Sequence, residues 1–148
     1  MSPTRWDPLT GTPMLLAPAR TTRPHDTGQG ATVAARCPFC PGAEAETPRE
    51  VWADRPAGSA PDGPGWRVRA VPNRFPVLPP DEGIHEVIIN TPRHVLALWD
   101  LEIDELTAAI NGWAIREAAV RADRRGLTPF LFVNQGAAAG ASLQHSHA

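Results

Sequence analysis

The clearest hydrophobic pattern lies in the second half of the chain. Apolar and polar positions alternate over residues 66–72, and a β-branched apolar run covers 85–90, so each stretch predicts a β-strand. A third apolar run, 128–133, predicts another strand. In the first half only 14–17 and 50–53 have the composition of an extended segment. We therefore expect a sheet built mainly from the second half.

A helical pattern separates the second of these strands from the third. Apolar side chains recur at helical spacing between 101 and 123, with Asp100 available as a cap and Gly126 as a stop. The apolar positions are Ile103, Leu106, Ile110, Trp113 and Val120. This order predicts an α+β fold in which one long amphipathic helix packs on one face of an antiparallel sheet.

Composition and charge narrow the class of protein. The formal net charge is −2 and the pI about 6.2, so no strong field favours nucleic acid or an anionic membrane. No run approaches the roughly 20 apolar residues of a membrane span, and the first residues lack the apolar core of a secretory signal. All 14 basic residues are arginine, which excludes a lysine nucleophile or general base. We expect a cytoplasmic protein.

The sequence C-P-F-C at 37–40 is the first candidate for chemistry. Its two thiols can reach one metal ion, and the same spacing suits a redox dithiol. Pro41 and Gly42 follow at once and break the helix that a thioredoxin-type pair requires, which favours a zinc knuckle. A structural zinc takes four ligands, so two more are expected among the five histidines. The redox pair remains the alternative.

The length of 148 residues fits a single domain over 1–148. Its first part, 1–65, is rich in proline and glycine and contains the C-x-x-C pair. We expect a loop-rich zinc-knuckle segment over 1–65 and a core of sheet and helix over 66–148.

The sequence H-S-H at 145–147 is the sharpest feature. We expect the two imidazoles to point to opposite faces of an extended segment and so to serve two sites, one ligating a metal and one facing a substrate. The glycine-rich run 136–142 before them can bring backbone N–H groups close to a phosphate. The alternative is a flexible polar tail with two exposed histidines.

Other side chains give weaker signals. Arg20 and Arg23 suit a phosphate, although arginine pairs are more often solvated surface. Asn73 can hydrogen-bond a base or sugar, but an asparagine at such a position more often forms an Asx-turn. The five tryptophans are interpreted as core or edge packing.

Five segments, taken in order, resemble a known family over nearly the whole chain. They are R-T-T-R-P at 20–24, C-P-F-C-P-G at 37–42, V-P-N-R-F-P at 71–76, G-I-H-E-V-I-I at 83–89, and the stretch from N-Q-G to H-S-H at 134–147. Together they resemble the amino-terminal half of the galactose-1-phosphate uridylyltransferases, within the histidine-triad superfamily. The fold that this resemblance implies is histidine-triad-like and truncated after the H-x-H motif.

The resemblance implies a double-displacement transfer of UMP. His147, as the second histidine of the pair, would attack the α-phosphorus of UDP-glucose, and galactose 1-phosphate would then accept the uridylyl group. An adenylyl-transferring relative, such as an ADP-sugar or dinucleoside-tetraphosphate phosphorylase, would share the histidine pair. A zinc-stabilised nucleotide-binding remnant without activity is the other alternative. By family habit the full-length enzyme would be a cytosolic homodimer.

The resemblance also implies a set of site residues. The zinc ligands would be Cys37, Cys40, His94 and His145, which make a closed structural site. The nucleotide contacts would be Arg20, Arg23, Asn73, Asn134, Gly140 and Ser142. His85 and His25 would be a strand residue and a surface residue. Two positions depart from the family pattern, because Ser146 stands where the best-known members have proline and Ala141 where some have cysteine.

Overall fold

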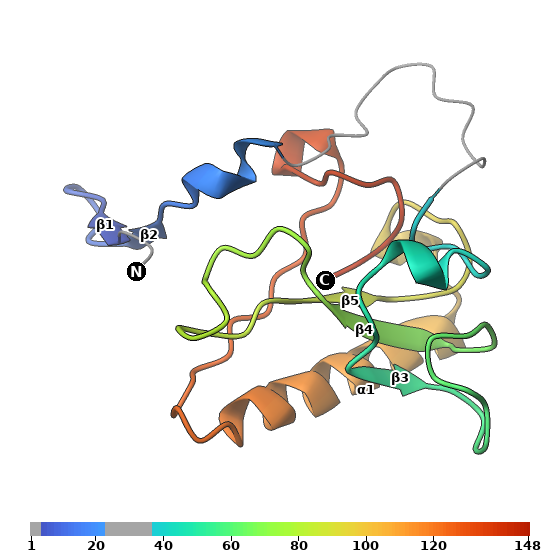
Figure 1. Ribbon diagram of the computed structural model, residues 1–148. Helices are drawn as coiled ribbons and strands as arrows, with labels where there is room; N and C mark the ends of the chain where they lie inside the picture. Colours follow the sequence, from blue (N-terminus) through green and yellow to red (C-terminus); the bar gives the residue numbers. More distant parts are fainter. Residues whose placement is uncertain (1–3, 23–36) are drawn as a thin grey trace.

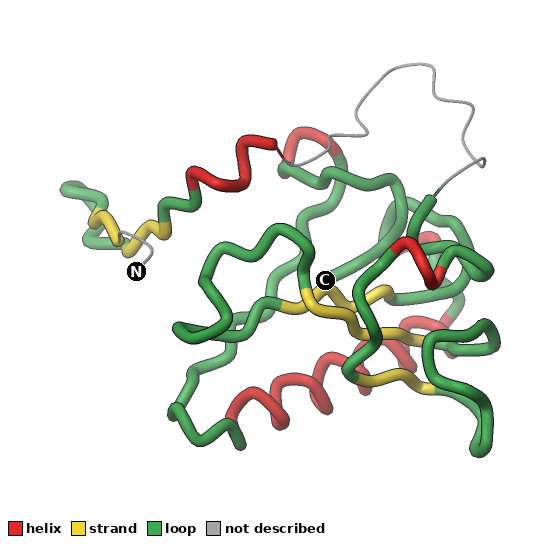
Figure 2. Tube along the Cα trace, viewed as in Figure 1, coloured by secondary structure: helices red, strands yellow, loops and turns green. Residues whose placement is uncertain are grey.

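A computed structural model describes residues 4–22 and 37–148, which form a three-stranded antiparallel sheet, a separate hairpin and one long α-helix (Figures 1 and 2). The strands are β1 (Thr4–Trp6), β2 (Pro13–Leu15), β3 (Trp52–Asp54), β4 (Val68–Pro72) and β5 (Glu86–Ile89), and the helix is α1 (Ile103–Arg121). Four short 3-10 helices are η1 (Pro18–Thr22), η2 (Glu44–Glu46), η3 (Leu98–Asp100) and η4 (Ala137–Ala139). The expected α+β fold class is confirmed.

The sheet has the strand order β3-β4-β5, and the last residues of the chain lie beside β5. Ile88 and Ala148 exchange two backbone hydrogen bonds of 2.9 Å, and His147 forms an antiparallel bridge with Ile89. These bonds tie the H-S-H segment to the sheet. The alternative of a flexible polar tail is therefore wrong.

The two faces of the sheet bury different side chains, because successive residues of a strand point to opposite sides. On one face Val68, Ala70 and Ile88 pack with Ala108 of α1. On the other face Ile89 packs with Phe39 and Trp66, against Cys37 and Val87. In Figure 1 the helix runs along one side of the sheet only, which leaves the other face to the segment that contains the C-x-x-C pair.

The helix approaches the sheet through small residues. Its buried positions are Ala108, Ala109 and Gly112, and a Cβ at Gly112 would lie only 2.9 Å from Val68 Cγ1. Ile103 is 85% exposed and Ile110 48% exposed, so their expected place on the core face is wrong. Because the helix lies so close to the strands, only small side chains fit between them. The larger side chains of Ile103 and Ile110 are exposed to solvent.

The predicted helix ends are also displaced. The helix begins at Ile103, where the backbone N–H of Glu102 donates to Glu105 Oε2 at 2.9 Å. Asp100 caps η3 instead, by accepting a 3.1 Å bond from the N–H of Ala97. At the other end the helix stops at Arg121, before Gly126. Side-chain bonding in the first turn thus sets where the helix begins, and both ends lie within a few residues of their expected places.

The strand expected at 128–133 is not formed. Phe130 is 85% exposed and Phe132 is 47% exposed, and both side chains line a cavity. An apolar run becomes a strand only where a neighbouring strand accepts its backbone hydrogen bonds, and here Ser146–Ala148 occupy the position beside β5. No helix among residues 4–22 and 37–148 is long and apolar enough to span a bilayer.

Candidate functional site

Four side chains from three distant parts of the chain meet beside the sheet. One potential ligand atom from each of Cys37, Cys40, His94 and His145 lies within 4.8 Å of the other three. The Nδ1 of His145 lies 3.5 Å from Cys37 Sγ and 3.7 Å from Cys40 Sγ, and the Nδ1 of His94 lies 3.4 Å from Cys40 Sγ. These are the four residues named as a ligand set by the family resemblance.

The spacing of these atoms fits a tetrahedral metal ion. Zinc bonds of about 2.3 Å to sulfur and about 2.0 Å to nitrogen place sulfur and nitrogen about 3.5 Å apart at tetrahedral angles. The three sulfur–nitrogen distances, 3.4 to 3.7 Å, lie close to that value. A set of two thiols and two imidazoles is typical of structural zinc. The residues present therefore fit a closed metal centre.

His145 is prepared to act as a ligand through Nδ1. Its Nε2 lies 2.8 Å from the carbonyl oxygen of Thr91, which can only accept, so Nε2 carries the proton and Nδ1 presents its lone pair to the cysteines. The side chain is 1% exposed, and burial lowers the pKa of His145 to about 4. The ring is therefore neutral at pH 7, as a metal ligand must be.

The other candidate ligands of the cluster are partly buried. Burial raises the pKa of the Cys37 thiol to about 11 in the metal-free protein, so binding of a cation would displace its proton. The Nε2 of His94 is buried and has no hydrogen-bond partner in the part of the chain that the structure describes.

The loop after the two cysteines is held by a buried carboxylate. Glu44 is 6% exposed and accepts hydrogen bonds from the backbone N–H of Gly42, at 2.8 Å, and from Trp66 Nε1, at 2.9 Å. Trp66 in turn packs with Phe39, which lies between the cysteines. Glu44 and Trp66 therefore anchor the C-x-x-C segment to the sheet.

His147 lies next to the metal centre without belonging to it. Its Nδ1 is 2.6 Å from the carbonyl oxygen of His145, so Nδ1–H donates and the neutral ring keeps a lone pair on Nε2. The expectation that the two imidazoles point to opposite faces is wrong. Both rings lie against Phe39, with centroid distances of 6.0 Å for His145 and 5.4 Å for His147, because residues i and i+2 of an extended segment share a face.

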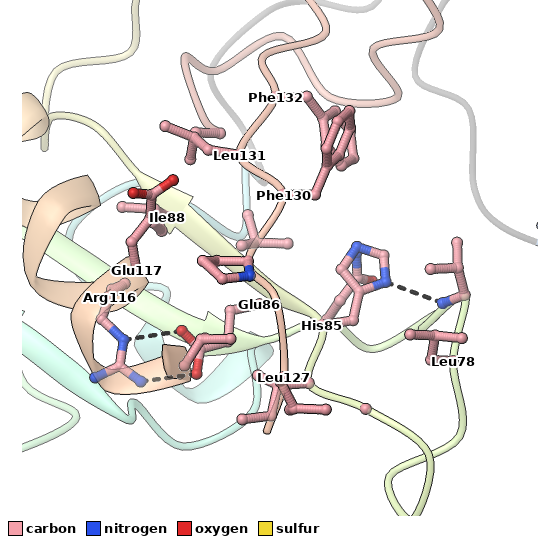
Figure 3. A pocket seen from close by; sticks show the side chains of 18 of the residues that line it. Leu78, His85, Glu86, Ile88, Arg116, Glu117, Leu127, Phe130, Leu131 and Phe132 are labelled. Atoms are coloured by element: carbon pink, nitrogen blue, oxygen red, sulfur yellow. Dashed lines mark hydrogen bonds and ion pairs between the residues drawn. The ribbon is translucent and has the colours of Figure 1, made fainter. Parts of the chain in front are cut away.

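A cavity of about 400 Å³ opens where His147 lies. Four of the expected site residues line it: Arg20, Asn73, Asn134 and His147. Figure 3 shows its wall, where Glu86 of β5 faces Arg116 of α1 through two bonds of 2.9 Å and apolar side chains such as Leu131 lie opposite. The Glu86 carboxylate neutralises Arg116, which leaves Arg20 as the candidate phosphate ligand among the described arginines that line the cavity.

Asn73 forms the Asx-turn that was the alternative expected for it. Its Oδ1 accepts a 2.8 Å bond from the N–H of Phe75, which is an Asx-turn, and its Nδ2 lies 3.0 Å from His85 Nε2. The other nitrogen of that ring, Nδ1, accepts a 2.9 Å bond from the N–H of Val77. The loop at 73–77 is therefore built around His85, and Asn73 reaches the cavity from that loop.

The other residues expected at the nucleotide site do not line the cavity or lie outside the described part of the chain. Gly140 adopts a φ of +83°, which favours glycine, and Ser142 is 4% exposed; neither lines the cavity. Arg23 and His25 lie outside the described residues.

The sequence did not indicate that several other residues would lie at this site. Trp113 was expected only to pack, yet it lines the cavity and donates from Nε1 to Asn90 Oδ1 at 2.9 Å. Glu86 and Arg116 lie 30 positions apart, and no local pattern links them. Trp6 and Trp99 are 66% and 80% exposed, so their expected place in packing is wrong.

Comparison with known proteins agrees with this geometry. Residues 67–148 match the N-terminal domain family of galactose-1-phosphate uridyl transferase. The chain is 29% identical over 167 residues to an ADP-glucose phosphorylase of Arabidopsis thaliana, covering 97% of this chain and 46% of the relative. It is 31% identical over 149 residues to a galactose-1-phosphate uridylyltransferase of Streptomyces lividans, covering 99% and 36%.

Solved structures agree as well. The crystal structure of the Arabidopsis thaliana ADP-glucose phosphorylase with bound ADP-glucose superimposes with a TM-score of 0.60 at 26% identity, covering 99% of this chain and 47% of the other. A uridylyltransferase structure superimposes with a TM-score of 0.56 at 30% identity, covering 99% and 45%. The chain thus spans less than half the length of these relatives.

Proposed function

The chain belongs to the galactose-1-phosphate uridyl transferase family, and from that membership we propose that it carries the nucleotidyl-transfer centre of a hexose-1-phosphate uridylyltransferase. The donor would be UDP-glucose and the acceptor galactose 1-phosphate. The observation that supports this most directly is the position of His147, which lines the same cavity as Arg20, Asn73 and Asn134 with its proton held on Nδ1.

The proposed reaction has two balanced steps. Nε2 of His147 attacks the α-phosphorus, a P–N bond forms, and the P–O bond to glucose 1-phosphate breaks, with the electron pair leaving on that phosphate oxygen. A phosphate oxygen of the acceptor then attacks the same phosphorus and the P–N bond breaks, which returns the neutral imidazole. Imidazole suits both steps because it is nucleophilic when neutral and leaves readily from a phosphoramidate.

The chain's own groups have defined roles in this proposal. The carbonyl of His145 holds the Nδ1 proton of His147 and stabilises the positive charge that the ring gains during attack. Arg20 would stabilise charge on the phosphate oxygens, and Asn73 and Asn134 would contact the nucleotide. Arg23, Gly140 and Ser142 stay predictions from the family pattern.

The metal centre would support this site rather than react. Cys37, Cys40, His94 and His145 would hold zinc, whose contribution when bound is to cross-link the C-x-x-C segment to the H-S-H segment. A closed set of four protein ligands leaves no position for substrate.

A second donor is favoured by one observation. The Arabidopsis relative with which the chain shares 29% identity is an ADP-glucose phosphorylase, and its structure was solved with ADP-glucose. Transfer of AMP from ADP-glucose through the same His147 is therefore the second candidate function.

The test is intact-protein mass spectrometry after incubation with UDP-glucose or with ADP-glucose. A gain of one UMP that is absent in His147→Ala and present in Arg121→Ala, which alters an exposed side chain outside the cavity lining, would support uridylyl transfer. A gain of AMP alone would assign the adenylyl class. No adduct from either donor on a folded, metal-loaded chain would overturn the proposal for this polypeptide.

A further inference from the structure

Ser146 lies between the two histidines, and its backbone N–H, its carbonyl and its hydroxyl each form a hydrogen bond. Its backbone N–H donates to the carbonyl of Val95 at 2.7 Å, and its own carbonyl accepts from the N–H of Asn90 at 3.1 Å. Its Oγ accepts a further bond from Asn90 Nδ2 at 3.1 Å. Ser146 is 3% exposed and Asn90 is fully buried. Asn90 therefore binds both the main chain and the side chain of Ser146.

The amide of Asn90 is oriented by the helix. An indole N–H can only donate, so the 2.9 Å contact from Trp113 Nε1 requires Asn90 Oδ1 on that side and leaves Nδ2 for Ser146. A continuous hydrogen-bonded chain thus runs from Trp113 of α1 through Asn90 to Ser146. It lies on the helix side of the sheet, whereas the rings of His145 and His147 lie on the Phe39 side.

Backbone hydrogen bonds hold the two peptide planes that flank Ser146, and the bond from Asn90 Nδ2 to Ser146 Oγ fixes the residue that joins these planes. The first plane contains the N–H bonded to Val95 and also the His145 carbonyl that accepts the Nδ1 proton of His147. The second plane contains the Ser146 carbonyl that Asn90 binds, and it leads directly into His147. Because a peptide plane is rigid, an anchor on one edge sets the direction of the group on the other edge.

We propose that Asn90, oriented by Trp113, is a positioning residue that sets the tautomer and direction of the His147 imidazole through Ser146. This inference rests on the proposed function, in which His147 is the nucleophile. A proline at position 146 would restrict the backbone by its ring, whereas serine does not. In this chain the hydrogen bonds from Asn90 supply that restriction instead.

The first test compares rates of adduct formation at varied donor concentration. Asn90→Ala is expected to lower the maximal rate about tenfold and to leave the half-saturating concentration within about twofold, because the group orients the nucleophile and does not line the cavity. Val68→Ala, which removes core packing on the same face, is the matched control for lost stability and is expected to retain the rate. A rate of Asn90→Ala equal to that of Val68→Ala would overturn the inference.

A double variant separates positioning from general damage. If Asn90 acts through Ser146, then Asn90→Ala combined with Ser146→Ala is no slower than Asn90→Ala alone. Multiplied losses would mean that the two residues act independently, against the proposal. If Asn90→Ala does not fold, Trp113→Phe keeps an aromatic side chain and removes the indole donor, and it is expected to slow the reaction in the same way.

A readout without substrate keeps this inference distinct from the proposed function. In wild-type protein, the nitrogen-15 shifts of His147 are expected to report a single tautomer with the proton on Nδ1, and Asn90→Ala should give a mixture. An unchanged tautomer in Asn90→Ala would overturn the positioning role. Absence of an adduct in wild-type protein would instead overturn the proposed function.

Discussion

The candidate metal centre and the cavity are separated by a single residue in the H-S-H segment, yet they are built in different ways. At the centre His145 is 1% exposed and the other three candidate ligands are half-buried, and the four come from segments more than 50 positions apart. The cavity is open, and its walls include side chains as exposed as Phe130, at 85%. A rigid centre that holds one histidine can present the other at an open cavity without making the cavity itself rigid.

The largest expected effect is loss of the metal centre. Cys37→Ser removes one ligand, so stoichiometric zinc should be lost and the unfolding temperature should fall by about 10 °C, since metal binding contributes to folding. Metal analysis under reducing conditions and thermal unfolding measure the two quantities. Cys37→Ser protein that kept one zinc per chain would contradict the assignment of this ligand.

A substitution in the cavity should abolish nucleotide transfer and leave metal binding intact. His147→Ala is expected to abolish the nucleotide adduct and to leave the zinc content unchanged, because the His147 ring lies outside the ligand set. Mass spectrometry and metal analysis on the same sample make the comparison. Loss of zinc together with the adduct would show that the two regions are not separable.

The segment between the two histidines couples the two regions. Ser146→Pro removes the N–H that donates to Val95, and it should cost about 1–3 kcal/mol of unfolding free energy in urea. Ser146→Ala keeps this N–H and is the matched control, with a smaller loss. Equal stability of the proline variant and wild-type protein would mean that the bond to Val95 contributes nothing.

The smallest expected effect is on the pH dependence of folding stability, through Glu105 of α1. Glu105 accepts hydrogen bonds from Arg93 and from the Thr91 hydroxyl, and the Arg93 bond is the main cause that lowers the pKa of Glu105 to about 2. A lowered carboxyl pKa stabilises the folded state above its ordinary value of 4.5, and this contribution is lost as the pH falls toward about 2. Glu105→Gln should therefore be less stable than wild type at pH 7 and match it near pH 2 in denaturant titrations. A difference that did not change with pH would exclude this linkage.

Much of the fold could be predicted because it depends on local pattern. Alternation over 66–72 and the β-branched run at 85–90 correspond to β4 and β5, and helical spacing corresponds to α1. The apolar run at 128–133 shows the limit of such prediction, because it has the composition of a strand but forms part of a cavity wall. Pairing with a neighbour decides strand formation, and no local pattern records that neighbour.

The candidate site divides in the same way. The sequence by itself determined which side chains have the chemistry: two thiols at C-x-x-C spacing, a histidine pair, and arginine as the only fixed cation type. Only the tertiary structure decided that Cys37, Cys40, His94 and His145 meet within 4.8 Å and that both imidazoles of the pair share one face. It also decided that Trp113 donates to Asn90, which in turn binds Ser146 between the two histidines. Residue chemistry is a local property, whereas distance and direction depend on how segments far apart in the chain pack together.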